Sequence, residues 1–251
     1  MFPICIFISV CLSHDLKIIL DIFILCFFCV GFYVFEFLRA TSNVSTENSP
    51  GKCEYTIVID AGHGGADGGA VASDGISEKV INLEIAYKLN YILRAYGLNT
   101  VMTRTDDESI HDSNAKTLRE QKVSDIHKRM SIMESDENNI FVSIHQNKFS
   151  NSSLWGTQVF YSPNTTDSAV LANCIQNSVC SLLQNDNKRV IKKSGSNIYL
   201  LYYAKRTAVL VECGFVSNPQ ENQLLENSDY QRKMAFSIAF GIMEYINTKD
   251  V

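Results

Sequence analysis

Four residues of this sequence carry side chains capable of chemistry where such side chains are unexpected. His63 follows the apolar run "TIVIDAG" in a glycine-rich loop, and His145 ends a second run, "FVSIH". Glu212 stands inside a third run, "AVLVECGFV", where burying a lone carboxylate costs free energy. Glu78 opens an amphipathic stretch after the glycine-rich loop. Two imidazoles and a carboxylate are zinc ligands, and three protein ligands leave a fourth position for a reactant.

This set predicts a hydrolytic metal site. Zinc on His63, Glu78 and His145 would polarise a carbonyl and lower the pKa of water. Glu212 would act as general base and then as acid to the leaving amine, and Asp60 would orient His63 by accepting a hydrogen bond. Taken alone, Glu78 also fits a first-turn helix carboxylate, and His145 a core histidine with satisfied hydrogen bonds.

The loop "GHGGADGG" also raises the alternative of a phosphate cradle. A dinucleotide fingerprint from Gly62 and Gly64 needs a third glycine where Asp67 stands, and no Gly-Lys-Ser/Thr follows. A carboxylate would also repel phosphate. We therefore expect the glycines to leave room for a large substrate, and Asp67 receives no role beyond shape.

The elements that must position these residues alternate between strands and helices. Buried or alternating apolar runs predict strands over 54–62, 98–104, 139–147, 156–162, 196–203 and 208–216. Helical periodicity predicts helices over 79–96, 123–135 and 168–184, with a short and a long helix after residue 218. The fold class is α/β, with a mostly parallel twisted sheet covered on both faces. In such sheets the chemistry lies beyond the carboxyl ends of the strands.

The chain before this domain has a different composition. Residues 1–40 hold the uniformly apolar stretch 22–35, which with its flanks can span a bilayer. A signal peptide and a retained signal-anchor both fit; we expect an anchor, because no clean cleavage site follows. Residues 41–52 are a small, polar linker, and residues 53–251 form the catalytic domain, outside the cytoplasm. A net charge of −5 gives no basic footprint for nucleic acid.

Four segments carry a resemblance to a known family. "VIDAGHGGADGGA", "ISEKVINLEIAYKL", "FVSIHQNKF" and "AVLVECGFVSNPQE" resemble, in order, the four blocks of the zinc-dependent N-acetylmuramoyl-L-alanine amidases of the amidase-3 class. The resemblance implies one zinc ion per chain on His63, Glu78 and His145, with Glu212 as catalytic residue. The implied reaction is hydrolysis of the amide between the lactyl group of N-acetylmuramic acid and L-alanine in peptidoglycan.

An apolar leader followed by a bare catalytic domain resembles the germination-specific amidases of spore-formers. They strip peptide from muramic acid so that a second enzyme closes a muramic δ-lactam in spore cortex. This implies a place on the outer side of a bacterial membrane, in the forespore–cortex space. Expected partners are peptidoglycan, the membrane and an activating protein. Alternatives are a general wall or septum autolysin, a non-catalytic peptidoglycan-binding domain, and another zinc hydrolase such as a sugar deacetylase.

Two further features lie between the second strand and the next helix. Polar residues over 109–123 exceed the short link expected there, and whether they gate the site stays open. We expect His111 and His127 to be solvated.

Overall fold

The computed structural model describes residues 55–249, which form one α/β domain. The predicted membrane segment (1–40) and linker (41–52) lie outside the described residues. Between residues 55 and 249, no helix combines the length and apolar character needed to cross a membrane.

A six-stranded sheet forms the centre of the domain, in the order β2-β1-β3-β6-β4-β5. β4 pairs antiparallel with β6, whereas the other neighbouring strands pair in parallel. The α/β class with a mostly parallel sheet is thereby confirmed. The strands are β1 (Thr56–Ala61), β2 (Asn99–Met102), β3 (Asn139–Asn147), β4 (Gln158–Tyr161), β5 (Lys192–Lys193) and β6 (Thr207–Phe215).

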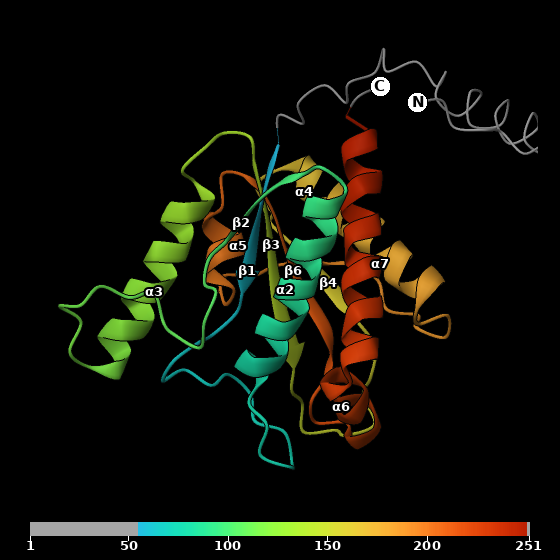
Figure 1. Cartoon of the computed structure of the whole chain (residues 1–251), viewed down its shortest axis with the longest axis horizontal. Coiled ribbons are helices and arrows are strands. Elements are labelled where there is room, and N and C mark those ends of the chain that lie inside the picture. Colours follow the sequence, from blue (N-terminus) through green and yellow to red (C-terminus); the bar gives the residue numbers. More distant parts are fainter. Residues whose placement is uncertain (1–54, 250–251) are drawn as a thin grey trace, which may run out of the picture. The chain divides into compact units, whose positions relative to one another are not determined.

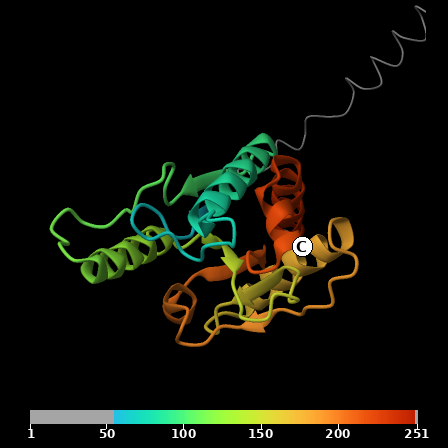
Figure 2. The ribbon, with the colours of Figure 1, turned by 90° about the horizontal axis from the view of Figure 1, so that it is seen from below.

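Helices cover the two faces of the sheet unequally. One face packs under the long helices α2 (Glu78–Ala95), α4 (Thr166–Leu182) and α7 (Ser228–Asn247), as Figures 1 and 2 show. The other face carries α3 (Leu118–Met133) and the single-turn α5 (Tyr199–Tyr203) over a smaller apolar cluster. α6 (Pro219–Glu226) joins β6 to α7.

Strand alternation places the polar residues of the sheet on one face. Ile57 and Ile59 of β1 enter the core under α2 and α7, while Val58 joins the cluster under α3 and α5. Asp60 follows Val58 at a spacing of two and so points to the α3 side. By the same rule His145 on β3 and Glu212 on β6, which are register partners, share this face.

The predicted strand over 196–203 is wrong, because residues 199–203 form helix α5. Tyrosine and isoleucine favour strands, yet one helical turn brings Ile198 and the fully buried Leu201 to the same side, against the α3-side cluster. Tertiary packing of these two side chains outweighs the local preference.

Helix α3 begins five residues before the predicted start. Thr117 and Glu120 form a capping box, in which the Thr117 hydroxyl accepts from the Glu120 amide and the Glu120 carboxylate accepts from the Thr117 amide. The box satisfies two amides that helix formation leaves unpaired. It therefore starts a helix in residues whose apolar periodicity is weak.

Candidate metal centre and active site

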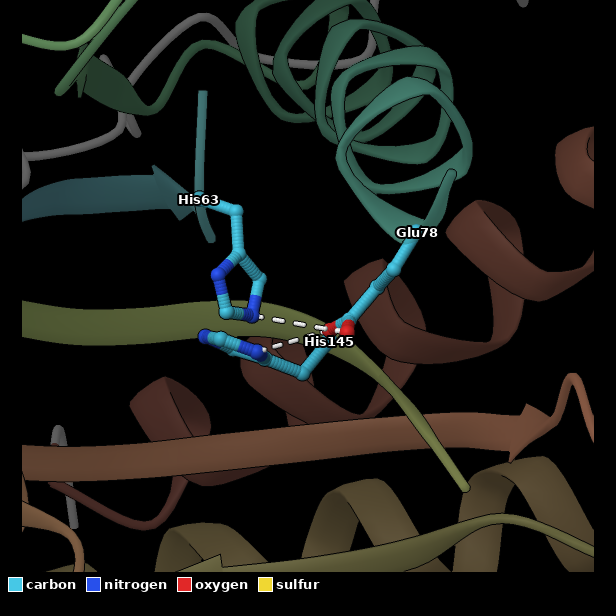
Figure 3. A group of neighbouring side chains, drawn as sticks. All are labelled: His63, Glu78 and His145. Atoms are coloured by element: carbon cyan, nitrogen blue, oxygen red, sulfur yellow. Dashed lines mark hydrogen bonds and ion pairs between the residues drawn. The ribbon is translucent and has the colours of Figure 1, made fainter. Parts of the chain in front are cut away.

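Three predicted ligands converge at the carboxyl ends of β1 and β3. Figure 3 shows His63 after β1, Glu78 at the start of α2 and His145 on β3 with their side chains pointing at one another. His63 Nε2 lies 3.4 Å from Glu78 Oε2, and His145 Nδ1 lies 2.9 Å from Glu78 Oε1. One ligand atom from each residue lies within 4.8 Å of the others.

The Glu78 carboxylate is buried and fixed by neutral donors as well. Its Oε1 accepts from the backbone N–H of Gln146 (3.0 Å) and the side chain of Asn82 (3.3 Å), and its Oε2 accepts from the backbone N–H of Ala70 (2.8 Å). Asn82 lies four residues after Glu78, so both face the same side of α2. These contacts orient the carboxylate toward the two imidazoles.

Two loop glycines make space for the ligands. A Cβ on Gly62 would lie 2.2 Å from His145 Nε2, and one on Gly69 would lie 2.6 Å from both Glu78 Oε2 and the His63 ring. Gly69 also has a φ of +68°. The expectation that the glycines make room for substrate is therefore unsupported at these two positions, where the side chains of the candidate ligands His63, Glu78 and His145 fill the space.

Asp67, rather than Asp60, orients His63. The Asp67 Oδ2 accepts from His63 Nδ1 at 2.9 Å, which leaves Nε2 directed at Glu78. Lys122 of α3 lies 2.9 Å from the other Asp67 oxygen. The prediction for Asp60 is wrong because both of its carboxylate oxygens accept hydrogen bonds from other side chains, those of Thr103, Ser143 and Arg129. The sequence signal for Asp67 is a carboxylate placed four residues after a loop histidine.

Burial and neighbouring charges shift the pKa values of His63 and Glu78. Burial works to lower the pKa of His63, but hydrogen bonds and charges from Asp67 and Glu78 prevail and raise this pKa to about 9. Burial likewise opposes ionisation of Glu78, yet the two imidazoles hold its pKa far below the usual range. The cluster therefore holds an ionised carboxylate between two imidazoles.

Asp60 belongs to a buried network that fixes the His63 loop. It accepts from Thr103 Oγ1 (2.7 Å), Ser143 Oγ (2.6 Å) and Arg129, whose guanidinium also donates to the carbonyls of Ala61 and His63 (both 2.9 Å). Burial raises the pKa of Asp60, but Arg129 and the two hydroxyls outweigh it, so the net pKa is lowered. Sequence reasoning missed Arg129, because nothing in a helical pattern shows which loop its side chain reaches.

Glu212 lies beside this cluster without a hydrogen-bond partner for one oxygen. Its Cα is the register partner of His145, and within residues 55–249 its buried Oε2 meets no donor. Burial raises the pKa of Glu212 to about 7. A buried carboxylate with a perturbed pKa beside a cavity is a candidate for proton transfer.

A cavity of about 640 Å³ opens from these residues between α3 and α5. Its lining includes His63, His145 and Glu212, together with Tyr199 of α5. Asp107, Glu108, Ser109 and His111 also line it, so the start of the polar insertion forms part of one wall. His111 is half-buried there, with Nδ1 2.8 Å from Ser109 Oγ, which corrects the expectation that it is solvated; His127 is exposed as expected.

The residues of the cluster fit a zinc ion by their chemistry. Two imidazoles, which bind metals in their neutral form, and one carboxylate match the usual zinc ligand types. The His63 imidazole also has the Asp67 carboxylate on its other ring nitrogen, as metal-binding histidines commonly do. The close ligand atoms and the open cavity beside them fit a catalytic rather than a closed structural site.

Replacing Asp67 by asparagine is expected to weaken zinc binding about 10- to 100-fold, because the His63 imidazole loses its charged acceptor. Competition of the purified protein with a chromophoric zinc chelator measures this affinity. Asp229→Asn, an exposed change on α7, is the control and should leave it unchanged. An unchanged affinity in Asp67→Asn would show that Asp67 does not orient a ligand.

Fold and site together define a class, the hydrolases of α/β fold with a candidate centre for one metal ion at the carboxyl ends of parallel strands. The match is more specific than the class, because residues 57–244 match the Amidase_3 family, N-acetylmuramoyl-L-alanine amidase. The chain belongs to this family, and its activity is that of an N-acetylmuramoyl-L-alanine amidase on peptidoglycan.

Individual relatives cover most of the domain. The germination-specific N-acetylmuramoyl-L-alanine amidase of Bacillus subtilis (strain 168) is 33% identical over 193 residues, which are 77% of this chain and 80% of that protein. The CwlD amidase from Clostridioides difficile, solved in complex with the GerS lipoprotein, has 40% identity and a TM-score of 0.74 over 77% of this chain and 99% of that one. AmiC2 of Nostoc punctiforme has 29% identity and a TM-score of 0.66 over 77% of this chain and 98% of that one.

Proposed function

We propose that the chain is a zinc-dependent amidase that cleaves between N-acetylmuramic acid and L-alanine with His63, Glu78 and His145 as metal ligands. The observation that carries this is the convergence of these three side chains in one cavity beside Glu212, whose Oε2 has no hydrogen-bond partner within residues 55–249. Bound zinc would supply Lewis-acid polarisation of the scissile carbonyl and activation of water. Glu212 would accept a proton from the attacking water and deliver it to the leaving amine of alanine.

Digestion of purified muropeptides by the full-length chain tests this proposal. We expect one zinc per chain, release of free stem peptides with the glycan intact, loss of activity in a chelator and recovery on adding zinc. Mass analysis distinguishes peptide release from loss of acetate. A protein that holds zinc but releases acetate would be a deacetylase, and binding without any product would indicate a non-catalytic domain.

The same digestion tests the biological setting. The germination-specific relative and the CwlD amidase support a role in spore cortex, so we expect faster release from cortex than from vegetative walls. The reverse preference would favour a general autolysin. The complex of the CwlD amidase with a lipoprotein supports a partner protein for this chain as well. We infer that this partner activates the enzyme, and full zinc content and activity of the purified chain alone would contradict that role.

The placement of the domain is part of the proposal. Residues 1–40 would hold residues 53–251 on the outer side of the membrane through the linker 41–52. Retention of the full-length protein in carbonate-washed membranes supports an anchor, whereas a shortened, released protein indicates a cleaved signal peptide.

A further inference from the structure

His145 of β3, Glu212 of β6 and Gln158 of β4 lie side by side across the sheet, and we call these three residues the catalytic row. Glu212 is opposite His145 on one side and opposite Gln158 of the antiparallel β4 on the other. Residues directly opposite on neighbouring strands point to the same face. A substrate held at His145 and Glu212 can therefore continue across Gln158 toward the β5 edge of the sheet.

Arg189 lies beside Gln158, at the β4 end of the catalytic row, and neighbouring groups hold its side chain in one orientation. Its Nε donates to the carbonyl of Trp155 at 2.8 Å, and its Nη1 lies 3.5 Å from Gln158 Oε1. The guanidinium carbon also lies 4.7 Å from the centroid of the Phe215 ring. Contacts on two sides restrict the side chain before any ligand arrives, which lowers the entropy cost of binding.

In the part of the chain that the structure describes, the charge of Arg189 has no matching carboxylate. Within residues 55–249, no acidic side chain lies within ion-pair distance of its guanidinium. Glu221 is close enough to be affected by its charge, but the two oxygens of Glu221 accept from the backbone N–H groups of Gly156 and Phe215. A half-buried guanidinium with free donors and no counter-ion is suited to an anionic group from outside the chain.

Charge is distributed unequally on the two sides of the metal centre. On the α3 side, the cavity is lined by Asp67, Asp107, Glu108 and Asp125, and its cations Lys122 and Arg129 already pair with Asp67, Asp60 and Asp125. On the β5 side, residues 186–193 contain four basic residues and one acid. In a chain of net charge −5, this segment of eight residues therefore carries a net charge of +3.

The substrate has two arms on either side of the scissile amide, the glycan and the stem peptide, and these arms also differ in charge. The glycan arm is neutral, because the muramic carboxyl is consumed in the scissile amide. The peptide arm carries carboxylates beyond the alanine. We propose that Arg189 is a specificity-determining residue, which binds a carboxylate of the stem peptide on the β4–β5 side and directs the glycan to the α3–α5 cavity.

The dimensions of the row agree with this assignment. Gln158 lies on the strand next to that of Glu212, and the Arg189 guanidinium contacts the far end of the Gln158 side chain. An extended peptide advances about 3.3–3.6 Å per residue, so two or three residues span this distance. The carboxylate bound is therefore that of an early residue of the stem peptide. The inference rests on the proposed function.

Two matched substrates test the role of Arg189 in the full-length chain. Both are disaccharide peptides, one with the carboxylate of the residue after alanine free and the other with it amidated. We expect kcat/KM for the free acid to exceed that for the amide by about 10- to 100-fold. Arg189→Gln should abolish the preference by raising KM for the free acid at unchanged kcat, and Arg189→Lys should retain part of it.

Lys188→Gln, an exposed change next to Arg189, is the matched control and should keep the preference. An unaltered preference in Arg189→Gln, or equal cleavage of both substrates by the parent chain, overturns the assignment while leaving the amidase activity established. Cleavage of neither substrate overturns the proposed function instead. Calorimetry of the parent chain with the free and amidated peptide products, without any substitution, should show weaker binding of the amide; equal binding contradicts the proposal.

Discussion

Glu212→Gln is expected to lower kcat for muropeptide hydrolysis by about 100- to 10,000-fold without loss of bound zinc, the range in which general acid–base groups contribute. Glutamine keeps the shape of the side chain but cannot accept and return a proton. Glu212 lies next to His145 in register, lines the cavity, and has an oxygen without a donor in the described part of the chain. Peptide release followed by chromatography, with zinc content measured on the same sample, checks the expectation.

Glu84→Gln is the matched control, because Glu84 is exposed on α2 and contacts only Lys88 among the charged residues described. It should leave both activity and zinc content unchanged. Normal activity in Glu212→Gln would remove this residue from the chemistry. Loss of zinc together with activity would instead place Glu212 among the groups that hold the metal.

Arg129→Met is expected to lower the free energy of unfolding by about 3–5 kcal/mol, because it leaves Asp60 charged, buried and without its cation. Arg129 is 3% exposed and Asp60 is 0% exposed. The change also removes the donor to the His63 carbonyl, so we expect weaker zinc binding as well. Urea denaturation followed by circular dichroism measures the stability.

The pH dependence of this effect has a defined sign. The pKa of Asp60 is lowered in the folded protein, so its contribution to stability is present above the usual aspartate pKa and is lost as pH falls through the folded value. Arg129→Met should therefore be most destabilising near neutral pH, with a smaller difference from the parent chain at acidic pH. Arg232→Met, an exposed change on α7, should have little effect at any pH. A destabilisation that does not vary with pH would show that the loss reflects packing rather than the ion pair.

Much of the site is predictable because its residues interrupt clear local patterns. Histidines at strand ends and a glutamate within an apolar strand conflict with burial, so the sequence alone singles out His63, His145 and Glu212. Their proposed roles remain predictions, although the structure brings them together. The residues that hold them are harder to find, since Asn82 and Arg129 lie in helices where a polar side chain is ordinary.

By itself, the sequence determined the α/β class, the strands that carry the site, and the positions of the candidate ligands, because apolar periodicity follows backbone geometry and burial along one element. Only the tertiary structure decided that Asp67 rather than Asp60 contacts His63, that residues 199–203 form a helix, and that Arg189 reaches the row of Glu212. Each of these outcomes depends on contacts between segments far apart in the chain or on loop conformation. Local periodicity carries no information about such contacts, since a polar side chain looks the same in sequence whichever partner it meets.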